Sequence, residues 1–126
     1  MDNNSDWNDG RQPIYRQLRE IVVMMILDGT LPEGDVLPSV RHIASQFQVN
    51  PLTVLKSYQL LVAEGIVESR RGRGMFVLPR ARQLLLASER ERFLQEEWPR
   101  VVDTLYRLGL NPEDLLKGAP PAAAKN

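Results

Sequence analysis

The chain has 126 residues, of which 43% are hydrophobic, enough for one small core with a helical extension but not for two large domains. Because it contains no Cys, the sequence excludes a disulfide scaffold, an iron–sulfur cluster and a thiolate zinc site, and it fits a reducing compartment. No apolar run reaches the roughly 20 residues that cross a bilayer, and the N-terminus is polar and acidic, so we expect a cytoplasmic protein without membrane contact.

Opposite charges balance over the whole chain but not within its parts. Residues 1–37 hold three basic and seven acidic side chains, whereas residues 38–78 hold five basic and two acidic ones. The remainder mixes eight basic with seven acidic side chains, which is typical of a solvated helical surface. Only the central segment therefore has the charge that complements a polyanion.

Three helices are predicted in the first half of the chain. Pro13 suits a helix start, and apolar residues with helical spacing follow it as far as Asp28-Gly29. Ser39 can cap a second helix, whose helical spacing is interrupted before Asn50-Pro51. This dipeptide combines a favoured cap with a favoured first residue, so a third helix is expected to run to Gly65.

A β-hairpin with a basic tip is predicted next. Two strand-like runs, residues 66–69 and 75–78, are separated by a segment of three arginines and two glycines, residues 70–74. The resulting fold class is mainly α with a small β-hairpin, in the element order of a winged helix-turn-helix. In that fold the second helix of the motif enters the major groove of DNA, and the hairpin lies beside it.

The part of the chain beyond Pro79 is predicted to be helical. A second tail helix is expected to start at about Pro99 and to end at Gly109, and residues 111–114 carry the signals of a short last helix ending at about Leu116. We therefore divide the chain into a flexible leader (1–10), a winged helix-turn-helix domain (11–79), a helical dimerisation domain (80–117) and a disordered tail (118–126).

Candidate DNA-binding residues lie at the starts of the second and third helices and at the hairpin tip. Backbone N–H groups at helix starts favour phosphate oxygens, and arginines on a glycine-containing turn suit a phosphate clamp. Taken singly, Arg41 and Thr53 are better explained as solvated helix surface, whereas a solubilising loop is the less favoured alternative for Arg70, Arg71 and Arg73. The candidates are Ser39, Arg41, Asn50, Thr53, Lys56, Arg70, Arg71, Gly72, Arg73 and Gly74.

The tail carries more apolar side chains than an isolated pair of helices can bury, so we expect burial against a second subunit. The alternative is that these side chains pack back on the winged domain. The expected dimerisation residues are Leu85, Leu86, Phe93, Trp98, Val101, Leu105 and Leu108.

No enzyme, metal or cofactor site is expected. His42 is the only histidine and lies on a motif helix, while the side chains of Glu96 and Glu97 diverge by about 100° on a helix and cannot face one substrate. The sequence Gly72-Arg73-Gly74 lacks the context of a nucleotide-binding loop. The short tail leaves little volume for a ligand pocket, so we expect no effector cavity within a single tail, although a pocket between subunits stays open.

The central motifs resemble those of the GntR family of bacterial regulators. They are Leu37-Pro38-Ser39-x-Arg41, Thr53-Val54 and Gly72-x-Gly74, and the resemblance covers roughly residues 11–79. It implies a winged helix-turn-helix in which Arg41, Thr53 and Gly72 contact DNA. Where many members have Arg, this chain has Pro51 and Leu55, so base preference does not carry over.

The short tail is similar to that of the YtrA-like branch of this family. That resemblance implies that the C-terminal helices serve dimerisation and that the target is an operon such as one encoding an ABC transporter. We therefore expect a homodimeric repressor that binds double-stranded DNA at a palindromic operator, with no effector identified. The competing interpretation is a winged-helix protein-interaction module without specific DNA binding.

Overall fold

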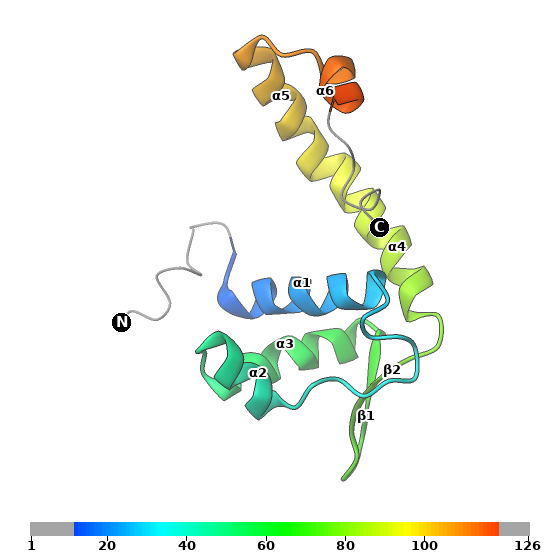
Figure 1. Ribbon diagram of the computed structural model, residues 1–126. Coiled ribbons are helices and arrows are strands. Elements are labelled where there is room, and N and C mark those ends of the chain that lie inside the picture. Colours follow the sequence, from blue (N-terminus) through cyan, green and yellow to red (C-terminus); the bar gives the residue numbers. More distant parts are fainter. Residues whose placement is uncertain (1–11, 119–126) are drawn as a thin grey trace. The chain divides into compact units, whose positions relative to one another are not determined.

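The computed structural model describes residues 12–118, which form six α-helices, one π-helical segment and a two-stranded sheet (Figure 1). The predicted leader and the predicted tail beyond Gly118 lie outside the described residues. The elements are α1 (Ile14–Leu27), α2 (Val40–Phe47), α3 (Pro51–Ala63), β1 (Val67–Arg70), β2 (Gly74–Val77), α4 (Ala81–Arg92), η1 (Phe93–Glu97), α5 (Trp98–Leu108) and α6 (Pro112–Gly118). Chain contacts divide the protein into two units, Met1–Leu86 and Ala87–Asn126, which are described separately below.

The helix-turn-helix of unit 1 begins and ends as the sequence predicts. The Ser39 hydroxyl accepts a hydrogen bond from the His42 N–H (3.0 Å), and the Asn50 side chain accepts one from the Leu52 N–H (2.8 Å). Between the two helices Gln48 adopts the left-handed conformation with φ 57°, and this ends α2. Local side-chain to backbone bonds therefore fix both helix starts.

The hairpin is antiparallel and pairs Val67 with Val77. β1 starts one residue later than predicted, and the Ile66 N–H donates instead to the Leu61 carbonyl at the end of α3 (3.0 Å). β2 starts one residue earlier, because Gly74 pairs with Arg70. The connection between α1 and α2 pairs with the other edge of β2, since the Leu37 N–H donates to the Met75 carbonyl (2.7 Å). The hairpin is thus tied to the segment that leads into α2.

A single hydrophobic core holds unit 1 together. It receives buried side chains from α1, α2, α3, the hairpin and the first turns of α4. Leu85, expected at the dimer interface, is 1% exposed in this core, so it offers no surface to a second subunit. Ala81 and Leu85 are one helical turn apart and share the buried face of α4, which is why unit 1 extends past Pro79 to Leu86.

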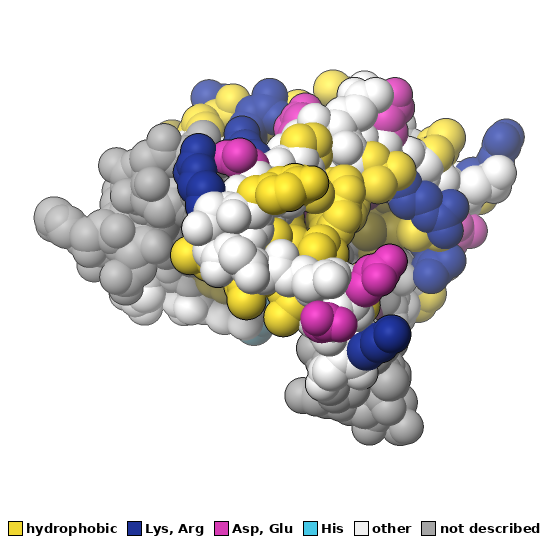
Figure 2. All heavy atoms as spheres, turned by 90° about the horizontal axis from the view of Figure 1, so that it is seen from above, with side chains coloured by type: hydrophobic (Ala, Val, Ile, Leu, Met, Phe, Trp, Pro, Cys, Tyr) yellow, Lys and Arg dark blue, Asp and Glu magenta, His cyan; other side chains and the backbone are white. Residues whose placement is uncertain are grey.

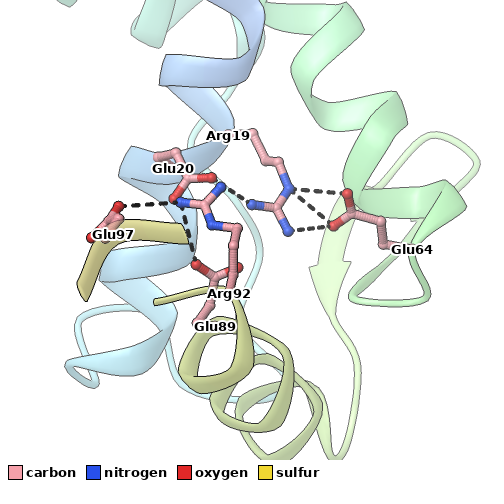
Figure 3. Close-up of polar contacts among 6 residues, drawn as sticks. All are labelled: Arg19, Glu20, Glu64, Glu89, Arg92 and Glu97. Atoms are coloured by element: carbon pink, nitrogen blue, oxygen red, sulfur yellow. Dashed lines mark hydrogen bonds and ion pairs between the residues drawn. The ribbon is translucent and has the colours of Figure 1, made fainter. Parts of the chain in front are cut away.

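An ion pair at the edge of this core connects α1 to the end of α3 (Figure 3). Arg19, 8% exposed, donates from Nε to both carboxylate oxygens of Glu64 (3.0 Å each) and from Nη2 to one of them (2.8 Å). Its Nη1 atom donates to Glu20 at 2.8 Å. The guanidinium is therefore buried, while the carboxylates that neutralise it are partly exposed at the edge of the core.

In unit 2 the backbone stays helical from Ala87 to Leu108, without the break that was predicted before Pro99. Arg92 and Trp98, the residues on either side of η1, both have right-handed helical φ and ψ angles. Proline cannot donate an N–H to the carbonyl four residues earlier, and a π-helical turn accommodates such an interruption without ending the helix. Pro99 lies in the first turn of α5, as the predicted helix start at about this residue requires, and the π segment before it joins α5 to α4 without a break.

A tight bend follows α5. Gly109 has φ 69°, and the Leu110 N–H donates to the Leu105 carbonyl at 2.9 Å. The Asn111 side chain then caps α6 by accepting a hydrogen bond from the Glu113 N–H (2.9 Å), as its sequence signal predicts. No residue of η1, α5 or α6 is buried in the single chain. Figure 2 shows hydrophobic side chains at the protein surface.

The bend also forms a hollow of about 400 Å³, which the sequence did not lead us to expect in a single tail. Its lining includes Leu105, Tyr106 and Leu110. Tyr106 is 82% exposed and Leu110 is 44% exposed, so the hollow is open to solvent.

Candidate DNA-binding interface

The start of α2 is held in place by a side chain of α3. The Tyr58 hydroxyl donates a 2.6 Å hydrogen bond to the carbonyl oxygen of Pro38, immediately before the cap residue Ser39. Burial raises the pKa of Tyr58 to about 12, so the phenol keeps the proton that it donates. The first turn of α2, with the exposed Arg41, is thereby fixed relative to α3.

Two opposite faces can be distinguished on α3. The buried face packs into the core and consists of Val54, Ser57, Tyr58 and Leu61. The outward face carries Leu52, Lys56 and Gln59, all exposed, while Thr53 lies half-buried at its side. The Lys56 ammonium lies 4.1 Å from the centre of the Tyr15 ring of α1, a cation–π contact that orients the lysine.

The hairpin tip presents arginines on a glycine turn. Gly72 has φ 72° and Gly74 has φ 113°, conformations that favour glycine. Arg70 is engaged along the hairpin, because its Nε donates to Glu68 (3.3 Å) and its guanidinium lies 4.2 Å from the Phe76 ring centre. Arg71 and Arg73 are exposed at the tip itself.

A groove of about 590 Å³ lies between the hairpin tip and the start of α2. Six of the predicted DNA-binding residues line it together: Ser39, Arg70, Arg71, Gly72, Arg73 and Gly74. The other four, Arg41, Asn50, Thr53 and Lys56, are not among its lining residues and belong to α2 and to the N-terminal half of α3. The groove is concave, basic and lined by backbone at a helix start, properties that suit a phosphodiester backbone.

Sequence reasoning missed two residues of this region. Tyr58 has the helical spacing of a core residue, which does not reveal its bond to Pro38. The one available signal is that a buried tyrosine hydroxyl needs a hydrogen-bond partner. Leu52 is 72% exposed on the outward face of α3, although its residue type suggests burial. Its outward position follows from the packing of Val54 and Tyr58 into the core, because at about 100° per residue Leu52 then lies on the opposite side of α3.

Residues 12–118 contain neither a metal-ligand cluster nor a membrane-spanning helix. These residues contain no group of three or more potential metal ligands from His, Cys, Asp and Glu. None of the helices in this range is both long and apolar enough to span a lipid bilayer.

The chain matches the family described as "Bacterial regulatory proteins, gntR family" over residues 14–77, half of its length. It is also 35% identical over 94 residues to the HTH-type transcriptional repressor YtrA of Bacillus subtilis strain 168. That alignment covers 75% of this chain and 72% of the repressor. The matched segment contains α1 to β2, the elements that build the candidate interface.

Two solved structures are similar to this protein. A GntR family transcriptional regulator from Listeria monocytogenes superposes with a TM-score of 0.68 and 28% identity, covering 86% of this chain and 94% of that one. The DNA-binding domain of AraR, in complex with operator ORR3, matches with a TM-score of 0.50 and 31% identity, over 52% of this chain and 78% of that one.

These similarities confirm the mainly α winged helix-turn-helix fold. Because the family and the aligned relative are transcription regulators, they also confirm that the protein is not an enzyme. The chain belongs to the gntR family of bacterial regulatory proteins, and it is a DNA-binding transcription regulator.

Proposed function

We propose that the protein is a homodimeric repressor, in which unit 2 joins two copies and each unit 1 binds one half of an approximately palindromic operator. The observation that carries this proposal is the lack of any buried residue in η1, α5 and α6. Their exposed hydrophobic side chains include Phe93, Leu94, Trp98, Val101, Tyr106, Leu108, Leu110, Leu115 and Leu116. So large an apolar surface on short helices favours burial against another subunit.

The expected dimerisation residues form a stripe on α5. Trp98, Val101, Leu105 and Leu108 are three or four residues apart, so they lie along one side of the helix. The Phe93 ring lies 6.3 Å from that of Trp98 and extends the stripe into η1. The solvent-open hollow beside Tyr106 adds a concave apolar surface of the kind that a partner subunit fills. Leu86 is half-buried in the single chain.

The association is tested by sedimentation velocity from nanomolar to micromolar concentration. We expect twice the chain mass at micromolar concentration for the unaltered protein and a monomer for Val101→Asp, which places a charge in the stripe. Arg100→Gln is a matched control, because it changes the net charge equally at an exposed residue outside the stripe and should stay dimeric. A chain that is monomeric at every concentration contradicts the proposal.

DNA recognition is tested by footprinting on the DNA upstream of the gene, with unrelated DNA as competitor. Two symmetric protected half-sites, centred about 34–36 Å apart or a multiple of this, are expected from a two-fold helix-turn-helix dimer. Val101→Asp should lose the competitor-resistant footprint. Binding that any competitor erases would favour the interaction-module alternative.

The wing arginines are proposed to bind phosphates, which carry no sequence information. Changing both Arg71 and Arg73 to Ala should weaken binding to all sequences. Each lost phosphate contact is expected to reduce the slope of log affinity against log salt by about 0.9. If the double variant keeps the full salt slope of the unaltered protein, a phosphate-clamp role for the wing is excluded.

The target is proposed to be an operon in the cytoplasm, where a repressor meets the chromosome. The similarity to YtrA-like regulators supports an ABC-transporter operon as that target. Comparing the transcripts of neighbouring genes with and without the protein tests this: transporter transcripts should rise when it is absent. Unchanged transporter transcripts would exclude such an operon as the target under the growth condition used.

A further inference from the structure

The first turn of α3 presents an apolar surface to solvent. Leu52 is 72% exposed, more than any other large hydrophobic side chain in the described part of unit 1. Pro51 beside it is exposed as well, and Leu55, one turn further, is half-buried. The part of the helix that enters the major groove in this fold therefore offers hydrocarbon where charged or hydrogen-bonding side chains are usual.

Leu52 lies directly opposite the side of α3 that packs into the core. At about 100° per residue, the buried Val54, Tyr58 and Leu61 centre on the side of the helix opposite to Leu52. Lys56, one turn further along, shares the outward face and keeps its ammonium on the Tyr15 ring. No rotation of the side chain brings Leu52 into the core, so this leucine is covered only when unit 1 binds something.

We infer that Leu52 contacts the 5-methyl group of a thymine in the major groove of each operator half-site. This inference rests on the proposed binding of an operator by α3. The thymine methyl is the one apolar group that base edges expose in the major groove, and apolar side chains are its complement. Placing leucine against a polar base edge instead would remove hydrogen-bonding groups from water without replacing their bonds.

The basic surroundings favour DNA over a protein as the partner of this apolar surface. Lys56 stands on the same face of α3, and the groove lined by Arg71 and Arg73 belongs to the same unit. A protein that covered Leu52 would have to pair or exclude these cations, whereas DNA offers phosphates to them and a methyl group to the leucine.

The experiment removes the methyl group alone. Duplexes are first selected from a randomised library with the unaltered full chain at near-physiological salt. Each thymine of the selected half-site is then replaced by deoxyuridine, which lacks only the 5-methyl group, and dissociation constants are measured for the unaltered protein and for Leu52→Ala. At one thymine position, the unaltered protein should bind about fourfold more weakly per half-site, the ratio for one buried methyl group.

Leu52→Ala should bind the thymine and deoxyuridine duplexes equally. Val62→Ala, which shortens a 37% exposed aliphatic side chain near the other end of α3, should keep the fourfold preference. If the alanine variant unfolds, Leu52→Gln provides a second variant with good helix propensity. It too should bind the thymine and deoxyuridine duplexes equally. Circular dichroism verifies the fold of each variant.

The inference is overturned if no thymine position distinguishes the unaltered protein from Leu52→Ala. It is equally overturned if deoxyuridine weakens both proteins by the same ratio, because the methyl group then acts through the shape of the DNA or through another residue. If the library yields no enriched sequence at all, operator binding itself fails, and this outcome is distinct from an enriched sequence without a methyl effect.

Discussion

The two units of the chain differ in where their hydrophobic side chains lie. Every buried hydrophobic residue among the described residues belongs to unit 1, from Leu18 to Leu85. Residues 87–118 carry apolar side chains at helical spacing, yet none of them is buried. Unit 1 thus contains its own stabilising core, whereas unit 2 has the pattern of a helical surface that is completed by another molecule. Substitutions in the two units should therefore have effects of different size and kind.

The largest effect is expected from a core residue of unit 1. Leu61 is 0% exposed at the centre of the core, so Leu61→Ala should lower the free energy of unfolding by about 2–5 kcal/mol, through lost burial and a residual cavity. Urea unfolding followed by circular dichroism measures this loss. In the monomeric Val101→Asp background, Leu116→Ala in α6, where the leucine is 75% exposed in the single chain, should change the unfolding free energy by less than about 0.5 kcal/mol. Equal losses in both variants would mean that unit 2 has a core of its own.

The next prediction compares one ion pair from each unit. In unit 1 Glu64 neutralises the buried Arg19, so Glu64→Gln should cost about 1–2 kcal/mol, because the charged guanidinium exchanges a carboxylate with two acceptor oxygens for one neutral amide oxygen. In unit 2 the Asp103–Arg107 pair (2.8 Å) is exposed at both side chains, and Asp103→Asn should cost no more than about 0.5 kcal/mol.

Salt provides the control for this comparison. Adding 1 M NaCl should abolish the small difference caused by Asp103→Asn, since exposed charges are screened over about 3 Å at that ionic strength. Most of the Glu64→Gln loss should persist, because Arg19 is buried. If salt removes both losses, the Arg19 pair behaves as a surface pair and contributes nothing specific to unit 1.

The sequence predicts best those features that a few adjacent residues determine. Ser39 and Asn50 cap the helices that were expected to start there, since their side chains bind backbone N–H groups two or three residues away. The positions of α2, α3 and the glycine turn of the wing are predictable for the same reason, because adjacent residues determine them. β1 starts one residue later than predicted, where the Ile66 N–H donates to the Leu61 carbonyl at the end of α3. Strand propensity alone does not include this contact.

Features that depend on a partner distant in sequence were not predictable. Leu85 has the same helical spacing as the exposed leucines of the tail, and spacing does not distinguish a chain's own core from a partner's surface. Pro99 marks the start of α5, as the sequence predicts, but it does not reveal the π segment η1 that joins α5 to α4. The contact of Lys56 with Tyr15 joins residues 41 positions apart in the sequence and exists only because α1 packs on α3.

The smallest of the effects within unit 1 concerns the hydrogen bond from Tyr58 to Pro38. At pH 7, Tyr58→Phe should lower the free energy of unfolding by about 1 kcal/mol, because a partly buried carbonyl loses its donor while the ring still fills the core. The folded-state pKa of Tyr58, about 12, lies above its ordinary value of 10.0. The contribution of the phenol is therefore complete below pH 10 and declines as the pH rises toward 12, since the unfolded chain loses its proton first.

The disadvantage of the Phe variant should accordingly disappear near pH 11, where the tyrosine alone loses about 1 kcal/mol of stability to ionisation. Urea unfolding of both proteins at pH 7, 9, 10 and 11 measures this convergence. A difference that stays constant up to pH 11 would show that Tyr58 does not ionise on unfolding in this range. The same bond fixes the start of α2, so the Phe variant should also bind DNA more weakly while its self-association through unit 2 remains unchanged.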